Sequence, residues 1–446
     1  MAVSKLCSST ANEGTIVVTK TKSIVIIGNG IAGNSAASAI REFDRTARIT
    51  MISDERLPLY SPCAFHKFFS GELQQPKLFL KQFDEYARDG IRTVFGRKVS
   101  EIDIGSRIVR IGDEAVHFDK LILATGSQLL PPPIKGIQKR GAFVVKTMDD
   151  ALAVSQYPAR SVAVLGSGPI GIETAVAFRK KGLEVALIEM FDRVLPRLFD
   201  RTAAALIQEI LENHGIRVLT QEKVAEIVGE ESVQGLVTDK QALDCQMVIM
   251  ATGARPNTEL AVRAGVATGP QGGIKTDPYM LTGSEDIYSC GDCIESRDAV
   301  TGQNALSMLW HNAKRQGRVA GLNAAGKRSR YAGAINATSM ELFGTHVASL
   351  GIGAASAYPD DQQKYETVDT ARGSALCRII LKDNRMVGIQ MIKNLQHGGV
   401  LLSRMVKKDK LFAAPKGVPF GASKFMRPWN YWMKAYGLAD SEPVPA

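Results

Sequence analysis

The sequence predicts an α/β fold with two parallel-sheet units and a third, α+β part. Two stretches predict the parallel sheets, because a buried strand, a glycine-rich turn and a helix follow one another at residues 23–37 and again from residue 161 onward. After Gly333, short apolar runs alternate with turns, which is typical of an antiparallel sheet with helices. The 446 residues are enough for two or three domains of this kind.

The first glycine-rich turn predicts a dinucleotide site. A run of Ile and Val at 23–27 predicts a buried strand, a helix follows from Asn34, and between them Gly28, Gly30 and Gly33 have the spacing G-x-G-x-x-G. The first glycine allows a tight turn, the second lets a diphosphate approach the backbone, and the third lets helix and strand pack closely. The free N–H groups at the start of the helix then bind the diphosphate.

The second glycine-rich turn predicts a second dinucleotide site. Its glycines are Gly166, Gly168 and Gly171. The next strand is followed by Glu189, whose spacing from the turn fits an acid that binds the 2′-hydroxyl of an adenosine ribose. This carboxylate would repel a 2′-phosphate, and the neighbouring Met190 and Phe191 supply no cation. We therefore expect NADH rather than NADPH.

Two further polar positions follow the first turn. Asp54 and Glu55 come directly after a strand at 48–53, and either acid could bind the other adenosine ribose.

Cys63 and Lys67 are four residues apart, a spacing that places both on one face of a helix. A lysine beside a cysteine would favour the thiolate. The spacing alone nevertheless favours the plainer interpretation, a small buried thiol and an exposed lysine.

The order of the later motifs resembles that of the pyridine nucleotide–disulfide oxidoreductase family, over Ser23 to Gly326. Two strands end in Thr-Gly, a proline run at 131–133 predicts a stiff crossing between domains, and a third strand ends in Gly-Asp. The resemblance implies that the first site binds FAD and the second NAD(P)H, and that Thr125, Gly126 and Gly253 pass near the cofactors. It also implies that Gly291 and Asp292 bind the flavin ribityl chain.

The resemblance predicts a discontinuous FAD-binding domain with the NAD-binding domain inserted. The expected divisions are a flexible leader at 1–22, the FAD domain at 23–150 and 268–330, the NAD domain at 151–267, and an α+β interface domain with a basic tail at 331–446.

Two branches of the family match this chain. No cysteine pair follows Gly33, which excludes the glutathione-reductase branch. In ferredoxin reductases, the position of Lys67 carries a lysine beside flavin N5, and Trp310 begins a matching W-x-N-A-x-x-Q-G motif whose tryptophan lies near the flavin. In NADH oxidases and CoA-disulfide reductases, the position of Cys63 carries a redox cysteine, although Ala64 here replaces a glycine. Glu173 resembles a family glutamate near the nicotinamide.

These resemblances lead to three hypotheses. The leading one is an FAD-dependent NADH oxidoreductase that exchanges electrons with an iron–sulfur protein or a larger oxidoreductase complex; the resemblance to flavoprotein subunits of 2-oxoacid dehydrogenases is looser. The alternative is an NADH oxidase or CoA-disulfide (persulfide) reductase that uses Cys63 as its redox thiol. The third is a flavin-based redox sensor.

Charge and composition limit the partners and the compartment. The formal charge is +10, and residues 401–446 contribute eight Lys/Arg against three acids, or +5, which suits an acidic partner protein. No nucleic-acid motif accompanies this charge, and no apolar run is long enough to span a membrane. Scattered cysteines and a polar start predict a cytoplasmic protein. The family resemblance implies a homodimer or a subunit of a larger complex. One C-x-x-C at 290–293 lacks a second, so we expect no metal site.

Overall fold

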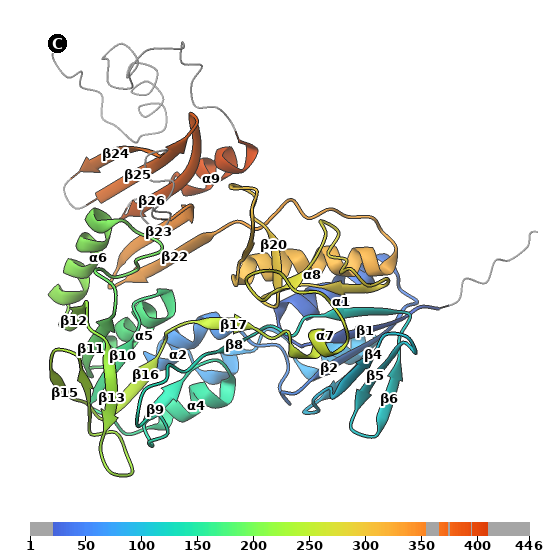
Figure 1. The fold of residues 1–446 in the computed structure, drawn as a ribbon, viewed down its shortest axis with the longest axis horizontal. Helices are drawn as coiled ribbons and strands as arrows, with labels where there is room; N and C mark the ends of the chain where they lie inside the picture. Colours follow the sequence, from blue (N-terminus) through green and yellow to red (C-terminus); the bar gives the residue numbers. More distant parts are fainter. Residues whose placement is uncertain (1–20, 354–364, 373–374, 394, 409–446) are drawn as a thin grey trace, which may run out of the picture.

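A computed structural model describes residues 21–353, 365–372, 375–393 and 395–408, and Figure 1 shows their arrangement. The first parallel sheet combines strands that come before the second parallel sheet in the sequence with one strand that comes after it. Its order is β19 (Ile287–Ser289), β7 (Lys120–Leu123), β1 (Ser23–Ile27), β2 (Arg48–Ser53) and β3 (Ile91–Phe95). The central strands are almost continuously apolar because helices or loops cover both faces of the sheet.

The second parallel sheet repeats this plan. Its order is β12 (Ile216–Thr220), β11 (Glu184–Glu189), β10 (Ser161–Leu165), β16 (Met247–Met250) and β9 (Ala142–Val144). All neighbouring strands of both sheets run parallel. The predicted α/β fold with two parallel sheets is therefore confirmed.

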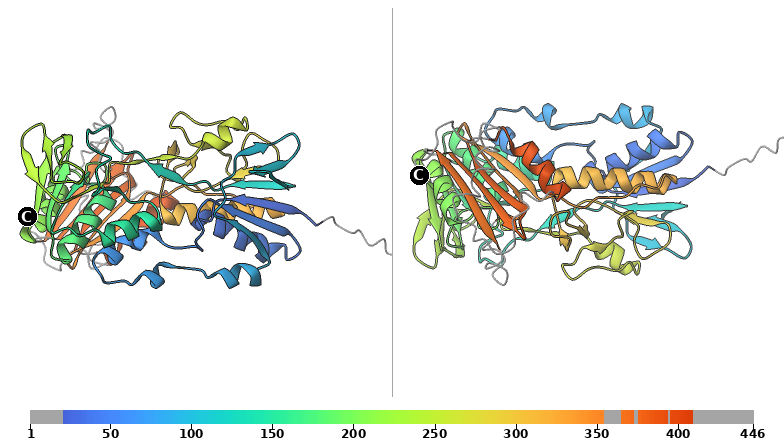
Figure 2. Two further views of the ribbon diagram at one scale, coloured as in Figure 1. Left: turned by 90° about the horizontal axis from the view of Figure 1, so that it is seen from below. Right: turned by 90° about the horizontal axis from the view of Figure 1, so that it is seen from above.

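An antiparallel sheet lies beside the second parallel unit (Figures 1 and 2). Its order is β22 (Ala337–Leu342), β23 (Thr345–Gly351), β26 (Arg385–Ile392), β25 (Ala375–Lys382) and β24 (Glu366–Arg372), with α9 (Gly398–Lys407) packed on it. This antiparallel sheet with its helix is the structure that the sequence predicts after Gly333. The leader up to residue 20 and the basic tail from residue 409 lie outside the described residues.

Smaller sheets and helices complete the two units. The antiparallel sheets are β4 (Glu101–Asp103), β5 (Ile108–Ile111) and β6 (Glu114–His117); β13 (Val224–Val228), β14 (Gly235–Thr238) and β15 (Ala242–Asp244); and β8 (Ser127–Leu129) with β17 (Ala254–Pro256). A mixed sheet contains β18 (Ile274–Lys275), β20 (Ile294–Arg297) and β21 (Asn304–Leu306). The remaining helices are α1 (Ile31–Phe43), α2 (Phe65–Phe69), α3 (Phe83–Arg88), α4 (Met148–Gln156), α5 (Pro169–Lys180), α6 (Arg201–Asn213), α7 (Glu259–Arg263) and α8 (Trp310–Ala325), with short 3₁₀ turns at Pro62–Ala64 and Gln75–Leu78.

The segment that contains Cys63 packs against the second unit, although it lies between two strands of the first. Phe65 and Phe69 of α2 belong to the core around β10 and α5, and Phe69 stacks on Phe178 with 5.5 Å between ring centroids. Helix α4 crosses the division expected at residue 150 and packs in the same core. The position of Cys63 is therefore tied to helix α5, which carries Glu173.

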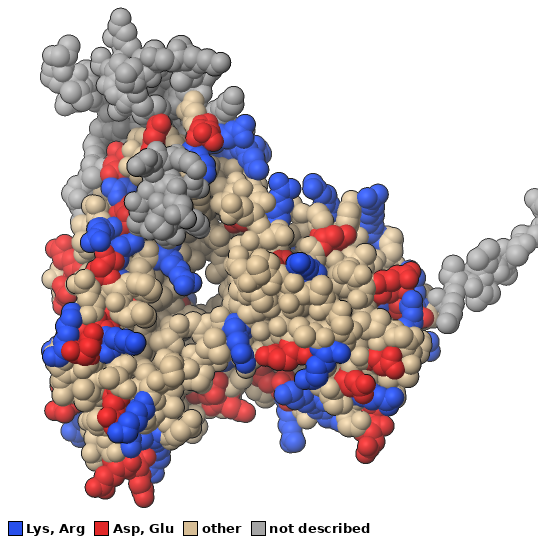
Figure 3. Space-filling model, in the orientation of Figure 1, with Lys and Arg blue, Asp and Glu red and all other residues tan. Residues whose placement is uncertain are grey.

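A small opening lies between two lobes that otherwise meet in the space-filling view of Figure 3. One lobe contains α5 and α6, and the other contains α1 and α8 (Figure 1). Within the described part of the chain, no helix is both long enough and apolar enough to cross a bilayer.

Candidate active site

The first glycine-rich turn has the geometry that its spacing predicts. Gly28 has φ +116°, and a Cβ there would lie 2.0 Å from the carbonyl oxygen of Ala124. A Cβ on Gly33 would lie 2.0 Å from the carbonyl oxygen of Gly28, so any side chain would separate α1 from β1. A Cβ on Gly30 would meet no atom within 4 Å. The turn is closely packed at its outer glycines and open at the middle one.

The second turn repeats this geometry. Gly166 has φ +97°, and a Cβ on Gly171 would lie 1.9 Å from the carbonyl oxygen of Gly166, whereas Gly168 again has open space within 4 Å. In both turns the open space lies at the N-terminus of a helix, α1 or α5, where backbone N–H groups favour an anion. The diphosphates of FAD and NAD fit these two places.

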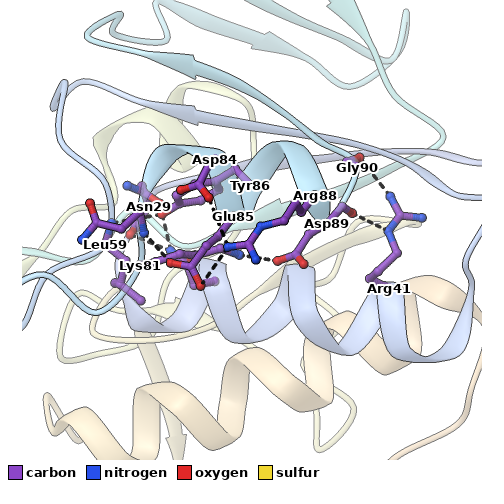
Figure 4. A network of polar contacts seen from close by, with 12 residues as sticks. Asn29, Arg41, Leu59, Lys81, Asp84, Glu85, Tyr86, Arg88, Asp89 and Gly90 are labelled. Carbon is purple, nitrogen blue, oxygen red and sulfur yellow. Dashed lines mark hydrogen bonds and ion pairs between the residues drawn. The ribbon is translucent and has the colours of Figure 1, made fainter.

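A buried tyrosine that the sequence analysis missed supports the first turn. The Tyr86 hydroxyl donates to Oδ1 of Asn29, at 2.7 Å, and accepts from the backbone N–H of Leu59, at 3.0 Å. Asn29 lies between the first two glycines, and Leu59 begins the segment that leads to Cys63. Figure 4 shows this network, in which Lys81 pairs with Asp89 and lies over the Tyr86 ring. No spacing rule marks Tyr86, because its partners come from distant segments.

Tyr86→Phe is expected to weaken FAD binding. The change leaves the Leu59 N–H without this buried partner, which costs about 1–3 kcal/mol, while the Asn29 amide oxygen still accepts from the Asn34 amide at 2.8 Å. We expect FAD affinity to fall by about tenfold, measured by fluorescence titration of the apoprotein. Tyr279→Phe, on the surface beside Arg328, is the control and should leave FAD affinity unchanged. Equal affinity of Tyr86→Phe and the unaltered protein would contradict the supporting role.

The structure distinguishes the two acids after β2. Glu55 is partly buried, and its Oε2 accepts from the Tyr60 hydroxyl at 2.7 Å. The same hydroxyl accepts from the backbone N–H of Met148 at 3.2 Å. Burial raises the pKa of Glu55. Asp54 is exposed directly at the end of the strand, so it is the better placed of the two for an adenosine ribose.

Glu189 is fixed to the second glycine-rich turn. It is 5% exposed, and its Oε2 accepts from the backbone N–H of Ser167 at 2.9 Å and from the Ser167 hydroxyl at 2.6 Å. Its Oε1 accepts from the backbone N–H of Phe191 at 2.9 Å. The nearby Arg193 contacts Asp192 and donates to two backbone carbonyl groups, so its guanidinium is held within the protein.

The late Gly-Asp turn is held by two side chains that sequence reasoning missed. Oδ2 of Asp292 accepts from the Ser127 hydroxyl at 2.9 Å. Lys146 donates to the same hydroxyl at 2.8 Å and lies 3.7 Å from Oδ2 of Asp292. Ser127 directly follows the first Thr-Gly pair, which is the one sequence signal that could have indicated it.

The Thr-Gly segments form the crossing between the units. The Thr125 hydroxyl donates to the carbonyl of Asn257 at 2.7 Å, and the Asn257 amide donates to the carbonyl of Thr125 at 2.9 Å. Gly126 and Gly253 have φ of +70° and +132°, and a Cβ on either would meet no atom within 4 Å. These contacts join β8 and β17 side by side.

The three residues expected to be catalytic come together. Cys63 lies in the 3₁₀ turn before α2, Lys67 on α2, and Glu173 on α5. Between the helices, Nδ1 of His66 lies 3.8 Å from Oε2 of Glu173. Burial raises the pKa of Glu173 to about 7, and Lys67 acts in the opposite direction.

The environment of Cys63 corrects one expectation. The side chain is solvent-accessible but recessed, and burial is the first cause that raises the pKa of its thiol. The Glu173 and Asp292 carboxylates raise this pKa further, and the Lys146 ammonium lowers it. Lys67 is exposed and acts on Glu173 and His66 instead. The plainer interpretation is therefore confirmed for Lys67, whose side chain is exposed, and wrong for Cys63, whose side chain is exposed rather than buried.

A family model for pyridine nucleotide-disulphide oxidoreductases matches residues 22–317, which include both glycine-rich turns and the Gly-Asp turn. The chain belongs to this family. It is an NAD(P)H-dependent flavoprotein oxidoreductase, and the family is FAD-dependent.

Relatives in this family support the family assignment and inform the choice of branch. The chain is 33% identical to an NADH oxidase of Methanocaldococcus jannaschii over 82% of this chain and 87% of the relative. It is 32% identical to an NAD(P)H coenzyme A polysulfide/persulfide reductase of Pyrococcus horikoshii over 74% and 76%. The structure of an NAD-dependent persulfide reductase from A. fulgidus has a TM-score of 0.83 at 27% identity, covering 94% and 86%. A ferredoxin reductase from Rhodopseudomonas palustris, at 23% identity over 84% and 91%, has a TM-score of 0.76 and shares the fold.

The motif that begins at Trp310 stabilises the architecture of this oxidoreductase. Asn312 binds the backbone of Ile335, and the Gln316 amide oxygen accepts from the N–H of Gly291 at 2.9 Å. A Cβ on Gly317 would lie 2.1 Å from the carbonyl oxygen of Ala32, so this glycine lets α8 pack against α1. Trp310 itself begins α8 and is partly buried. These residues hold the Gly-Asp turn in place and let α8 lie against α1.

No group of three or more His, Cys, Asp or Glu side chains that could bind a metal ion occurs among the described residues. Cys290 and Cys293 are both fully buried, and the Cys293 thiol donates to the carbonyl of Cys290.

Proposed function

We propose that this chain is an NADH-dependent flavoenzyme that reduces a small disulfide or persulfide at Cys63. The observation that carries the proposal is the position of Cys63, a solvent-accessible thiol on the segment between the two units, with Glu173 of α5 and Asp292 of the Gly-Asp turn acting on it. The names of the relatives support this alternative better than the leading expectation of an iron–sulfur partner.

The cofactor sites follow from the two turns. We assign FAD to Gly28, Gly30 and Gly33, with Asp54 at its adenosine ribose and Asp292, fixed by Ser127, at its ribityl chain. NAD belongs at Gly166, Gly168 and Gly171, with Glu189 facing its ribose and Glu173 near the nicotinamide. The open space beside the middle glycine of each turn supports both assignments.

The proposed reaction breaks one sulfur–sulfur bond. The Cys63 thiolate attacks one sulfur of the substrate and forms a mixed disulfide, while the other sulfur leaves as a thiol. Bound FAD would supply the hydride chemistry, carrying an electron pair from NADH to the mixed disulfide. Overall, NADH, one proton and RSSR′ give NAD⁺, RSH and R′SH, and a persulfide RSSH gives RSH and H₂S.

An anaerobic dithionite titration of the holoprotein, with free thiols assayed alongside, tests the proposal. A Cys63 that enters the reaction can rest as a mixed disulfide or as sulfenic acid, and either form accepts two electrons in addition to the two of FAD. We expect four electrons per FAD and one protein thiol that appears on reduction, with a second, small thiol released where Cys63 rests as a mixed disulfide. Two electrons with unchanged thiols, in a protein that also fails to reduce disulfides, would overturn the proposal.

NADH is expected to be preferred over NADPH by about 100-fold in kcat/KM, equivalent to ~2.7 kcal/mol. The fixed carboxylate of Glu189 would repel a 2′-phosphate, and Arg193 is engaged elsewhere. Steady-state rates with each nucleotide measure the ratio. Glu189→Ala should reduce it, whereas Glu184→Ala at the exposed start of the same strand should not. Comparable kcat/KM values in the unaltered enzyme would contradict this assignment.

Electron exchange with an iron–sulfur protein or complex remains the second candidate function. The raised pKa of Cys63 supports it, because burial and the carboxylates of Glu173 and Asp292 disfavour the thiolate. An acidic partner would bind the basic chain at a rate that falls with salt. Rapid electron transfer to an iron–sulfur acceptor by Cys63→Ser would favour this function. Slow FAD reduction, well below about 1 s⁻¹, would instead favour a redox sensor.

A further inference from the structure

His66 and Glu173 form a contact that the proposed function does not yet use. His66 is on the same segment as Cys63, three residues further on, and Glu173 reaches it from α5. The ring nitrogen and the carboxylate oxygen are 3.8 Å apart, and the two side chains are 28% and 25% exposed. Packing of α2 on α5, including the Phe69–Phe178 stack, fixes their separation.

The charges around the pair come from both helices. Burial lowers the pKa of His66, as do Lys67 on its own helix and Lys180 on α5, whereas the Cys63 carbonyl and Glu72 raise it. Burial raises the pKa of Glu173 to about 7, and Lys67 lowers it. The shift of the His66 pKa favours the neutral imidazole, and the shift of the Glu173 pKa to about 7 favours a carboxyl that can carry a proton near neutral pH. The pair can hold one mobile proton next to Cys63.

We propose that Glu173 and His66 relay a proton during cleavage of the sulfur–sulfur bond, an inference that rests on the proposed function. When the Cys63 thiol becomes the nucleophile, its proton passes to Glu173. The pair then gives this proton to the sulfur that leaves the substrate. One S–H bond breaks at Cys63 and one forms on the leaving thiol, so the step is balanced without another reactant. Glu173 would be the catalytic residue, and His66 would position it and share its proton.

Two disulfides with different leaving groups test the relay. Coenzyme A disulfide releases an alkyl thiolate, which is basic and needs a proton as it leaves. Dithiobis-nitrobenzoate releases an acidic aromatic thiol, which leaves without one. The quantity to compare is the rate with coenzyme A disulfide divided by the rate with the aromatic disulfide. Because both reactions need the Cys63 thiolate, the ionisation of Cys63 cancels in this ratio. We expect this ratio to fall as pH rises through about 7 in the unaltered enzyme, because the pair then loses its proton.

His66→Asn and Glu173→Gln should each lower the ratio of the coenzyme A disulfide rate to the aromatic disulfide rate by about tenfold at neutral pH. The ratio should then no longer depend on pH. The double variant should be no slower than either single variant, because both residues serve one proton path. His214→Asn, at the exposed end of α6, is the control and should behave like the unaltered enzyme.

A measurement without turnover adds a second readout. The rate of Cys63 alkylation by iodoacetamide, followed across pH in the holoenzyme, reports the thiol pKa. Glu173→Gln should move the midpoint to lower pH, because it removes a carboxylate that raises this pKa. An unchanged midpoint, or equal slowing with both disulfides, would overturn the relay. If Cys63→Ser keeps full disulfide reductase activity, the proposed function itself fails, so the two failures are distinct.

Discussion

Cys63→Ser is expected to lower turnover with coenzyme A disulfide by more than about 1,000-fold, while FAD reduction by NADH changes by less than about twofold. A serine hydroxyl cannot form a sulfur–sulfur bond, so the mixed disulfide is lost. In the proposed arrangement, the transfer of hydride from NADH bound at α5 to the flavin does not involve this thiol. Anaerobic stopped-flow absorbance at the flavin band measures the NADH half-reaction, and thiol release measures turnover.

Cys245→Ala provides the matched control for this prediction. Cys245 is 4% exposed in the core beneath β13–β15, away from the segment between the units. We expect normal turnover with a loss of unfolding free energy of about 1 kcal/mol from the missing sulfur contacts. If Cys63→Ser and Cys245→Ala turn over disulfides equally well, Cys63 is a structural thiol and the search moves to electron-accepting proteins.

Gly171→Ala is expected to remove NADH-dependent activity altogether, and Gly168→Ala to weaken NADH binding in a protein that stays folded. The added Cβ at Gly171 would lie 1.9 Å from a backbone oxygen, so α5 must move away from β10 at a cost of about 3 kcal/mol or more. The same atom at Gly168 meets no protein atom within 4 Å and occupies only the space beside the turn. We expect its KM for NADH to rise by about 100-fold.

Thermal unfolding and FAD content separate the two effects. Gly168→Ala should keep the melting temperature and a full FAD complement, because the first glycine-rich turn is untouched. Gly171→Ala should lower the melting temperature, and it should also disturb Glu173, two residues further along the same helix. An unaltered KM for NADH in Gly168→Ala would show that the diphosphate does not lie at this turn.

Local patterns in the sequence determined the parallel strands, the two glycine-rich turns and the expectation of two dinucleotides. Burial on both faces requires continuous apolar strands, and contact between helix and strand excludes any Cβ at Gly33 and Gly171. These requirements act over a few residues, so spacing alone reveals them. The family resemblance also follows from motifs that stay in order along the chain.

Only the tertiary structure decided which charges act on the site. Sequence left Asp54 and Glu55 equal, and the hydroxyl of Tyr60 engages Glu55. Spacing left open whether Lys67 acts on Cys63, whereas Lys146, which follows strand β9, is a cation that lowers the pKa of this thiol. The contacts of Tyr86 with Asn29 and of His66 with Glu173 also appear only in the folded chain. Such contacts join segments far apart in the chain, and they exist only because α2 packs on α5 and the loops converge around that packing.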